Sequence, residues 1–111
     1  MLLRERYTYY GAQAMSDAET LAIIIGTGCS TSSAYGVALT LMHAFGGLRG
    51  IAKREAKELE VIPGIGAVKA LQIHAALQLS KRLLYTDNLA TEAIRHPAEA
   101  ASILSPRLRG L

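Results

Sequence analysis

One short segment, IPGIG at residues 62–66, carries the residue types that bind a phosphate through the protein backbone. Pro63 fixes φ and cannot continue a helix, and Gly64 and Gly66 allow backbone angles that other residues avoid. The pattern predicts a tight turn between two helices, with the N-terminus of the second helix exposed. The unpaired N–H groups and the dipole of a helix N-terminus favour an anion. Residues 61–79 are therefore interpreted as a helix–hairpin–helix element.

The predicted phosphate site comprises this turn and the first residues of the following helix. We expect the backbone N–H groups to hold the phosphate, and Lys69 to add a positive charge. Ile62 and Ile65 would anchor the turn to the core. Such a site reads no bases, so binding should be weak and should decrease with salt. A plain turn between helices, or a protein-contact site, is the alternative. The site residues are Gly64, Ile65, Gly66, Ala67, Val68 and Lys69.

A second glycine turn precedes another predicted helix and offers a second candidate phosphate contact. It has glycines and hydroxyls but lacks a cation, so a plain loop is the alternative. The two turns also suggest a weak internal duplication of helix, Gly-x-Gly turn and helix. The residues of this possible second hairpin are Gly26, Thr27, Gly28 and Ser30.

Other side chains that could perform chemistry are isolated. Cys29 is the only cysteine, which excludes an internal disulfide and a site built on several thiolates. His43, His74 and His96 lie far apart, with no further ligand at metal-binding spacing. We therefore expect no catalytic residue, no metal site and no cofactor in this chain.

Composition favours a single all-α domain. The chain has 111 residues, is 50% apolar and contains only five tyrosines and one phenylalanine, so Leu, Ile, Val and Ala must form the core. The net charge is +3, and residues 49–85 hold seven lysines and arginines against three glutamates. No stretch approaches the roughly 20 apolar residues of a membrane span. Without a signal-peptide pattern, we expect a cytoplasmic protein that does not contact membranes.

Local signals predict five or so helices. A capping box at Ser16 and Glu19 starts a strongly apolar helix, which Gly26 ends. Ser32 or Ser33 caps the next helix, and Gly46-Gly47 ends it. The lead-in at residues 1–15 is expected to be partly helical. The predicted helices span residues 17–25, 34–45, 48–53 (a short helix or turn), 54–60 and 67–85.

The last predicted helix has two separate apolar arcs, so it should pack against two different things. One is the core of the domain. The other is the N-terminal segment, a partner chain or a following domain. If the domain binds another protein or domain, we expect the second arc to form that contact. The first arc holds Val68, Ala75, Ala76, Leu79 and Leu83, and the second holds Ala70, Ile73, Leu77 and Leu84.

Turn signals follow at Asp87-Asn88 and His96-Pro97. We therefore expect residues 1–85 to form the helix–hairpin–helix domain. Residues 86–111 would be a linker, with one short helix at residues 97–104, and the start of a missing C-terminal domain.

These residues resemble the N-terminal region of the RadC family of bacterial proteins. The resemblance implies a DNA-binding-type helical domain and, from the family's name, a link to DNA repair. Family members continue into a JAB/MPN-type domain with a zinc-metalloprotease-like motif of two histidines, a serine and an aspartate. This chain has no His-x-His, so that activity does not carry over. The matching stretches are Met15–Ile24, Gly26–Gly28, Phe45–Leu48 and Pro63–Ala70.

The layout is also similar to DNA glycosylases that contain a helix–hairpin–helix. In those enzymes a catalytic lysine follows two residues after the second glycine, or a catalytic aspartate comes later. Val68 stands at that lysine position, and no aspartate occurs between Ala67 and Thr86. The chain therefore lacks the catalytic residue of these glycosylases.

The sequence predicts a non-enzymatic module that binds DNA backbone without sequence preference, in a RadC-like protein. The alternative is a protein-interaction or regulatory domain for a C-terminal metalloprotease-like domain. Its expected partners are DNA and the protein's own C-terminal domain. The sequence is also compatible with a homo-oligomer.

Overall fold

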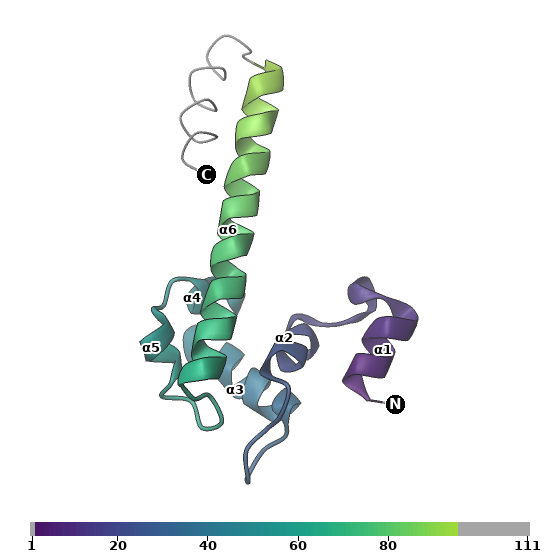
Figure 1. Ribbon diagram of the computed structural model, residues 1–111, viewed down its shortest axis with the longest axis vertical. Helices are drawn as coiled ribbons and strands as arrows, with labels where there is room; N and C mark the ends of the chain where they lie inside the picture. The colour runs from purple at the N-terminus through teal and green to yellow at the C-terminus, as the bar shows by residue number, and fades with distance from the viewer. Residues whose placement is uncertain (1, 96–111) are drawn as a thin grey trace. The chain divides into compact units, whose positions relative to one another are not determined.

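The computed structural model describes residues 2–95, and the surroundings of side chains through residue 91 (Figure 1). The chain divides into two compact units, Met1–Leu77 and Gln78–Leu111. Apart from one isolated bridge between Cys29 and Ser32, the described residues contain helices and turns only, which confirms the predicted all-α class. The elements are α1 (Leu3–Tyr10), the 3₁₀ segment η1 (Ala12–Ala14), α2 (Asp17–Ile25), α3 (Ala34–Phe45), α4 (Leu48–Ala52), α5 (Ala56–Leu59) and α6 (Ala67–Arg95).

Helix α2 begins and ends where the sequence predicts. The Ser16 hydroxyl accepts from the Glu19 amide at 3.2 Å, and the Glu19 carboxylate accepts from the Ser16 amide at 3.0 Å. This is the predicted capping box, and it satisfies two amides that the helix leaves unpaired. Arg6 of α1 donates to the same carboxylate at 2.5 Å. Because α1 contains no buried residue, this ion pair is one of the contacts that fix α1 on α2.

Helix α3 also has the predicted bounds. The Ser33 hydroxyl accepts from the Gly36 amide at 3.1 Å, so Ser33 is the cap rather than Ser32. Gly46 ends the helix in the left-handed conformation, at φ +77°, which glycine adopts without steric cost. The two short helices α4 and α5 follow, and Leu59 at the end of α5 is fully buried as expected.

Helix α6 is longer than predicted. It continues to Arg95, so the predicted end at Tyr85 is wrong and Asp87-Asn88 lies within the helix. The hydroxyls of Thr86 and Thr91 donate to carbonyls one turn earlier, at 2.9 and 3.0 Å. These bonds satisfy the polar side chains inside the helix, and the weak turn preference of Asp and Asn costs only a few tenths of a kcal/mol against continuation. The helix predicted at residues 97–104 and the predicted start of a C-terminal domain lie outside the described residues.

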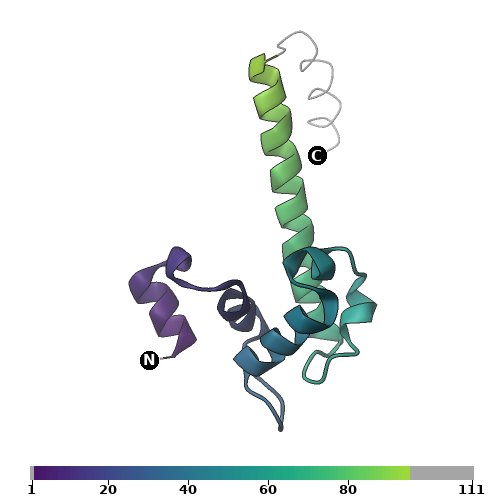
Figure 2. The ribbon, with the colours of Figure 1, turned by 180° about the vertical axis from the view of Figure 1, so that it is seen from behind.

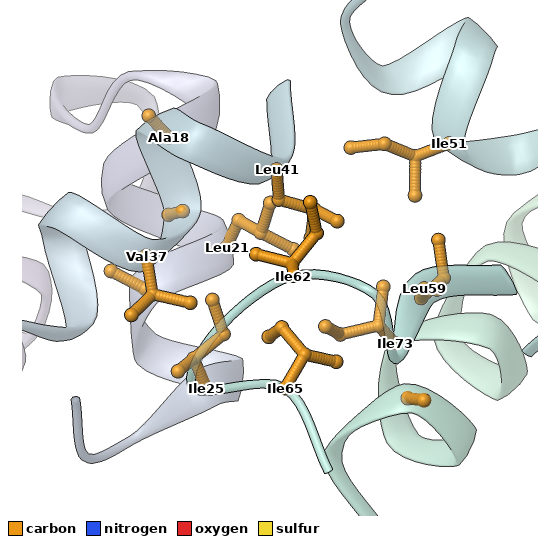
Figure 3. Packing of buried hydrophobic residues seen from close by; sticks show 13 residues of the cluster. Ala18, Leu21, Ile25, Val37, Leu41, Ile51, Leu59, Ile62, Ile65 and Ile73 are labelled. Carbon is orange, nitrogen blue, oxygen red and sulfur yellow. The ribbon is translucent and has the colours of Figure 1, made fainter. Parts of the chain in front are cut away.

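The core of the first unit brings together α2, α3, α4, α5, the first turns of α6 and the turn at residues 60–66. Ile62 and Ile65 of that turn point into the cluster, as Figure 3 shows. They therefore anchor the turn, as predicted. Burying each such side chain contributes about 1.5–3 kcal/mol. The cluster consists of Ala18, Leu21, Ala22, Ile25, Val37, Ala38, Leu41, Ile51, Leu59, Ile62, Ile65, Ala70 and Ile73.

The assignment of the two arcs on α6 is reversed by the structure. Ala70 and Ile73 of the second arc are fully buried, and Leu77 packs against the same cluster. These three residues of the second arc thus cover the domain's own core, whereas Leu84, the fourth residue of that arc, is 64% exposed. Val68 of the first arc is instead 68% exposed. Among residues 2–95, no helix is long and apolar enough to cross a membrane.

Candidate nucleic-acid interface

The turn between α5 and α6 is built from two consecutive tight bends. The Ile62 amide donates to the Leu59 carbonyl at 3.2 Å, and the Ile65 amide donates to the Ile62 carbonyl at 3.0 Å. The Ile65 amide is therefore already used, and its side chain is buried. Of the predicted site residues, Ile65 is an anchor and offers no group to a ligand.

Five amides around the start of α6 face no acceptor in the part of the chain that the structure describes. The first i to i−4 backbone hydrogen bond of α6 runs from the Ala70 amide to the Gly66 carbonyl at 2.9 Å, which leaves the amides before it unpaired. This is the expected condition of a helix N-terminus without a capping side chain. The five amides belong to Gly64, Gly66, Ala67, Val68 and Lys69, all of them residues of the predicted phosphate site.

The two glycines of the turn have different roles. Gly64 has φ +95°, and a Cβ there would lie 2.9 Å from Cγ2 of Val37. Gly64 therefore lets the turn lie close against α3. Gly66 does not have a positive φ, so the prediction of an unusual angle there is wrong. A Cβ on Gly66 would meet nothing within 4 Å, so its surface is open to a ligand.

Lys69 connects the two glycine turns. Its ammonium donates to the Thr27 carbonyl at 2.5 Å and to the Thr27 hydroxyl at 3.2 Å, across 42 residues of sequence. The structure thus brings the two predicted sites together at one cation. An ammonium has three N–H donors, so one N–H of Lys69 is not used by Thr27. Thr27 had been predicted only as a phosphate contact, and nothing local marks it as a lysine partner.

In the second turn, both Gly26 and Gly28 are required by the structure of the turn itself. Gly26 ends α2 with φ +80°, and its amide donates to the Ala22 carbonyl. A Cβ on Gly28 would lie 2.0 Å from the Ser32 carbonyl oxygen, so Gly28 permits the close bridge between Cys29 and Ser32. Ser30 lies exposed at the tip of this bridged turn. These contacts explain the glycines without a ligand.

A shallow hollow extends over the first turn, and its charged lining comes from Glu60 and Lys69. The remaining lining is mostly apolar or backbone. The sequence does not predict Glu60 as part of the site, although its place two residues before Ile62 is a signal that could have indicated it. Its carboxylate opposes the binding of an anion in the same hollow. The lining residues are Glu60, Ile62, Pro63, Gly64, Ile65, Gly66, Ala67, Val68 and Lys69.

Cys29 lies beside the second turn. Its sulfur is 3.4 Å from the Thr31 hydroxyl, and this hydrogen bond lowers the pKa of the thiol below its usual value. Within residues 2–95 no three metal-ligating side chains gather that could hold a metal ion.

The fold and the site together define a small all-α domain in which two glycine turns meet at one lysine. The UPF0758 N-terminal family matches residues 3–71, which include both turns and Lys69. The chain therefore belongs to the UPF0758 family and holds its N-terminal domain.

Full-length relatives support this assignment. The chain is 36% identical to a UPF0758 protein of Desulforudis audaxviator over 96% of its own length and 46% of the relative. It is 38% identical to one of Shouchella clausii, over 97% of this chain and 47% of the relative, and 41% identical to one of Xanthomonas oryzae, over 96% and 47%. The chain thus spans about half the length of these relatives. No solved structure matches it.

Proposed function

We propose that this domain binds the backbone of DNA without sequence preference, through α5, the turn at residues 60–66 and α6 acting as a helix–hairpin–helix. The observation that carries the proposal is the open surface at Gly66, where unpaired amides border a hollow that Lys69 also lines. A phosphate can approach a residue without a Cβ closely, and the helix dipole favours its charge.

Lys69 supports this function in two ways. Its bonds to Thr27 hold the ammonium in place, so less side-chain entropy is lost when a phosphate binds. Its third N–H is left to meet an anion. Resemblance to the RadC family agrees with a DNA-binding role and suggests DNA repair as the setting.

The small number of contacts should make the proposed binding of DNA weak. One turn contacts one or two phosphates, and Glu60 repels them from the edge of the same hollow. Affinity should therefore be low at physiological salt and should fall as the salt concentration rises.

The test is a titration of labelled duplex and branched DNA at about 50 and 200 mM salt. Gly66→Val fills the open surface, and Lys69→Glu reverses the charge. We expect each change to weaken binding at low salt by about tenfold. Arg82→Glu, the same charge reversal on an exposed part of α6, is the matched control. Thermal unfolding verifies that each variant folds. Absence of binding at low salt, or affinity unaffected by both changes, would contradict the proposal.

A second candidate function is docking onto the half of the family's proteins that this chain does not cover. The observation that favours it is the exposed apolar surface of α6 in the second unit, where Leu79, Leu83 and Leu84 are each more than 60% exposed. Leu79 and Leu83 are four residues apart, so they lie on one face of the helix and can form one side of a helix–helix contact. A metalloprotease-like C-terminal domain, as the RadC resemblance implies, would be the occupant.

This candidate is tested by mixing the chain with the separately produced C-terminal half of a UPF0758 relative and measuring association by calorimetry. Leu79→Glu with Leu83→Glu should abolish the association, whereas Lys69→Glu should leave it unchanged. A chain that ignores the other half, and does not self-associate, would rule out this use of α6.

A further inference from the structure

A row of basic side chains follows α4 and α5. Arg49 and Lys53 are four residues apart, and Lys53 continues the helical backbone of α4 at φ −85° and ψ −7°. Residues at this spacing are neighbours on one helix face, so the two positive charges repel each other. Lys57 follows in α5, and all three side chains are exposed. These three residues are called the basic edge.

The acidic residues of this segment do not neutralise the basic edge directly. Glu55 and Glu58 form a reciprocal capping box at the start of α5. Glu58 also pairs with Arg54 at 3.3 Å, and Arg54 lies over the ring of Phe45 at 5.3 Å. Arg54 and both glutamates are thus engaged locally. Within residues 2–95, Arg49, Lys53 and Lys57 form no ion pair.

The basic edge leads into the proposed DNA site. Helix α5 continues directly into the turn at residues 60–66, with Lys57 one helical turn or so before its first residue. Figures 1 and 2, seen from opposite sides, both place α4, α5 and this turn on one side of the first unit and α1 on the other. A small anion could occupy only one of these positions, but a long polyanion can reach several.

We propose that the basic edge is a second contact surface for the same nucleic acid, and that Arg49, Lys53 and Lys57 each meet a backbone phosphate. This inference rests on the proposed function of the turn. The turn fixes one point of the backbone, and the basic edge determines the direction in which the nucleic acid runs from it. It reads no bases, since contacts from the Arg49 guanidinium and the two lysine ammonium groups to phosphates carry no sequence information.

The number of phosphates engaged can be measured. The logarithm of the binding constant falls linearly with the logarithm of the salt concentration, and each neutralised phosphate adds about 0.9 to the magnitude of this slope on duplex DNA. Slopes below are given as magnitudes. The turn alone predicts a slope of about 1 to 2, and the basic edge raises it to about 4. We would measure this slope with a duplex of arbitrary sequence, for the wild-type chain and for the triple variant Arg49→Gln, Lys53→Gln, Lys57→Gln. A triple variant Arg4→Gln, Lys81→Gln, Arg82→Gln loses the same charge elsewhere.

We expect the basic-edge variant to lower the slope by about 2 to 3 and to weaken binding at low salt by at least about tenfold. The matched variant should change the slope by less than about 1. Equal losses in both variants would mean that net charge alone acts, and would overturn the inference. An unchanged slope in the basic-edge variant, with binding still sensitive to Gly66→Val, overturns the inference but leaves the function of the turn intact. If the wild-type chain binds no duplex, both proposals fail.

Discussion

The Lys69 ammonium and the Thr27 carbonyl, 2.5 Å apart, join the end of α2 to the start of α6. The contact closes a segment of 42 residues that contains α3, α4 and α5. It lies between the two glycine turns, so it couples the stability of the domain to the geometry of the proposed DNA site.

Replacing Lys69 with methionine removes both bonds to Thr27 but keeps most of the apolar stem. We expect the free energy of unfolding to fall by about 0.5–1.5 kcal/mol, as for a hydrogen bond at a partly exposed site. Urea unfolding measures the difference. Lys53→Met, at an exposed lysine without an ion pair in the described residues, should cost less than about 0.5 kcal/mol. Equal stability of the two variants would show that the Lys69–Thr27 contact contributes nothing.

Alanine at Gly64 and alanine at Gly66 should have unequal effects. At Gly64 the new Cβ meets Val37 at 2.9 Å and φ is +95°, so we expect a loss of about 1–3 kcal/mol. At Gly66 the Cβ enters open space, and only the preference of the helix N-cap for glycine over alanine is lost, which costs about 0.5–1 kcal/mol. Thermal unfolding of both variants tests this order. The reverse order would contradict the roles given to the two glycines.

Acid should weaken the link between α1 and α2. The Ser16 amide first, and then Arg6, hold the pKa of the Glu19 carboxyl below its ordinary value of 4.5. A carboxyl with a lowered pKa stabilises the fold above its unfolded pKa, and this contribution is lost as pH falls through the folded pKa. We therefore expect stability to decline below about pH 4.5.

Glu19→Gln should flatten this acid decline, since glutamine does not titrate. Denaturant unfolding at a series of pH values between about 6 and 3 provides the comparison. Glu5→Gln, at an exposed position on α1, serves as the control and should keep the wild-type profile. If the stability of Glu19→Gln falls with pH as steeply as that of the wild-type chain, the acid-sensitive group is another residue.

Removing the charge of Glu60 should strengthen DNA binding. Glu60 lines the same hollow as Gly66 and Lys69, so Glu60→Gln removes a charge repulsion of about 1 kcal/mol, the value for two charges about 4 Å apart in water. We expect the dissociation constant for duplex DNA at low salt to fall by about threefold, measured by fluorescence anisotropy. Glu5→Gln again controls for net charge. A weaker or unchanged affinity would mean that phosphates do not enter this hollow.

Local signals were sufficient to predict several elements. Ser16, Glu19 and Gly26 fix both ends of α2 by interactions within four residues, so its bounds follow from the sequence. The same is true of α3, with Ser33 and Gly46. The end of α6 was missed because Asp87-Asn88 carries only a weak turn preference, which a long helix overrides.

The site could be predicted only in part, because its geometry depends on distant residues. The five free amides follow from the local turn. The pairing of Lys69 with Thr27 depends on how α2 packs near α6, and no spacing within either segment reveals it. Likewise, both arcs of α6 are apolar, so the sequence of the helix alone does not tell which one covers the core. Val37 determines the need for glycine at residue 64, and it lies in another helix.

The interior contains only hydrocarbon: among the described residues no polar or charged side chain is buried. Aliphatic groups attract one another without directional preference, so many combinations of Leu, Ile, Val and Ala could fill this volume. The information that selects one arrangement must then reside at the boundaries of the helices, in caps such as Ser16 and Ser33 and in the glycine at residue 64. Exchanges of interior residues that conserve volume should therefore preserve the fold, whereas these few positions on the periphery determine its shape.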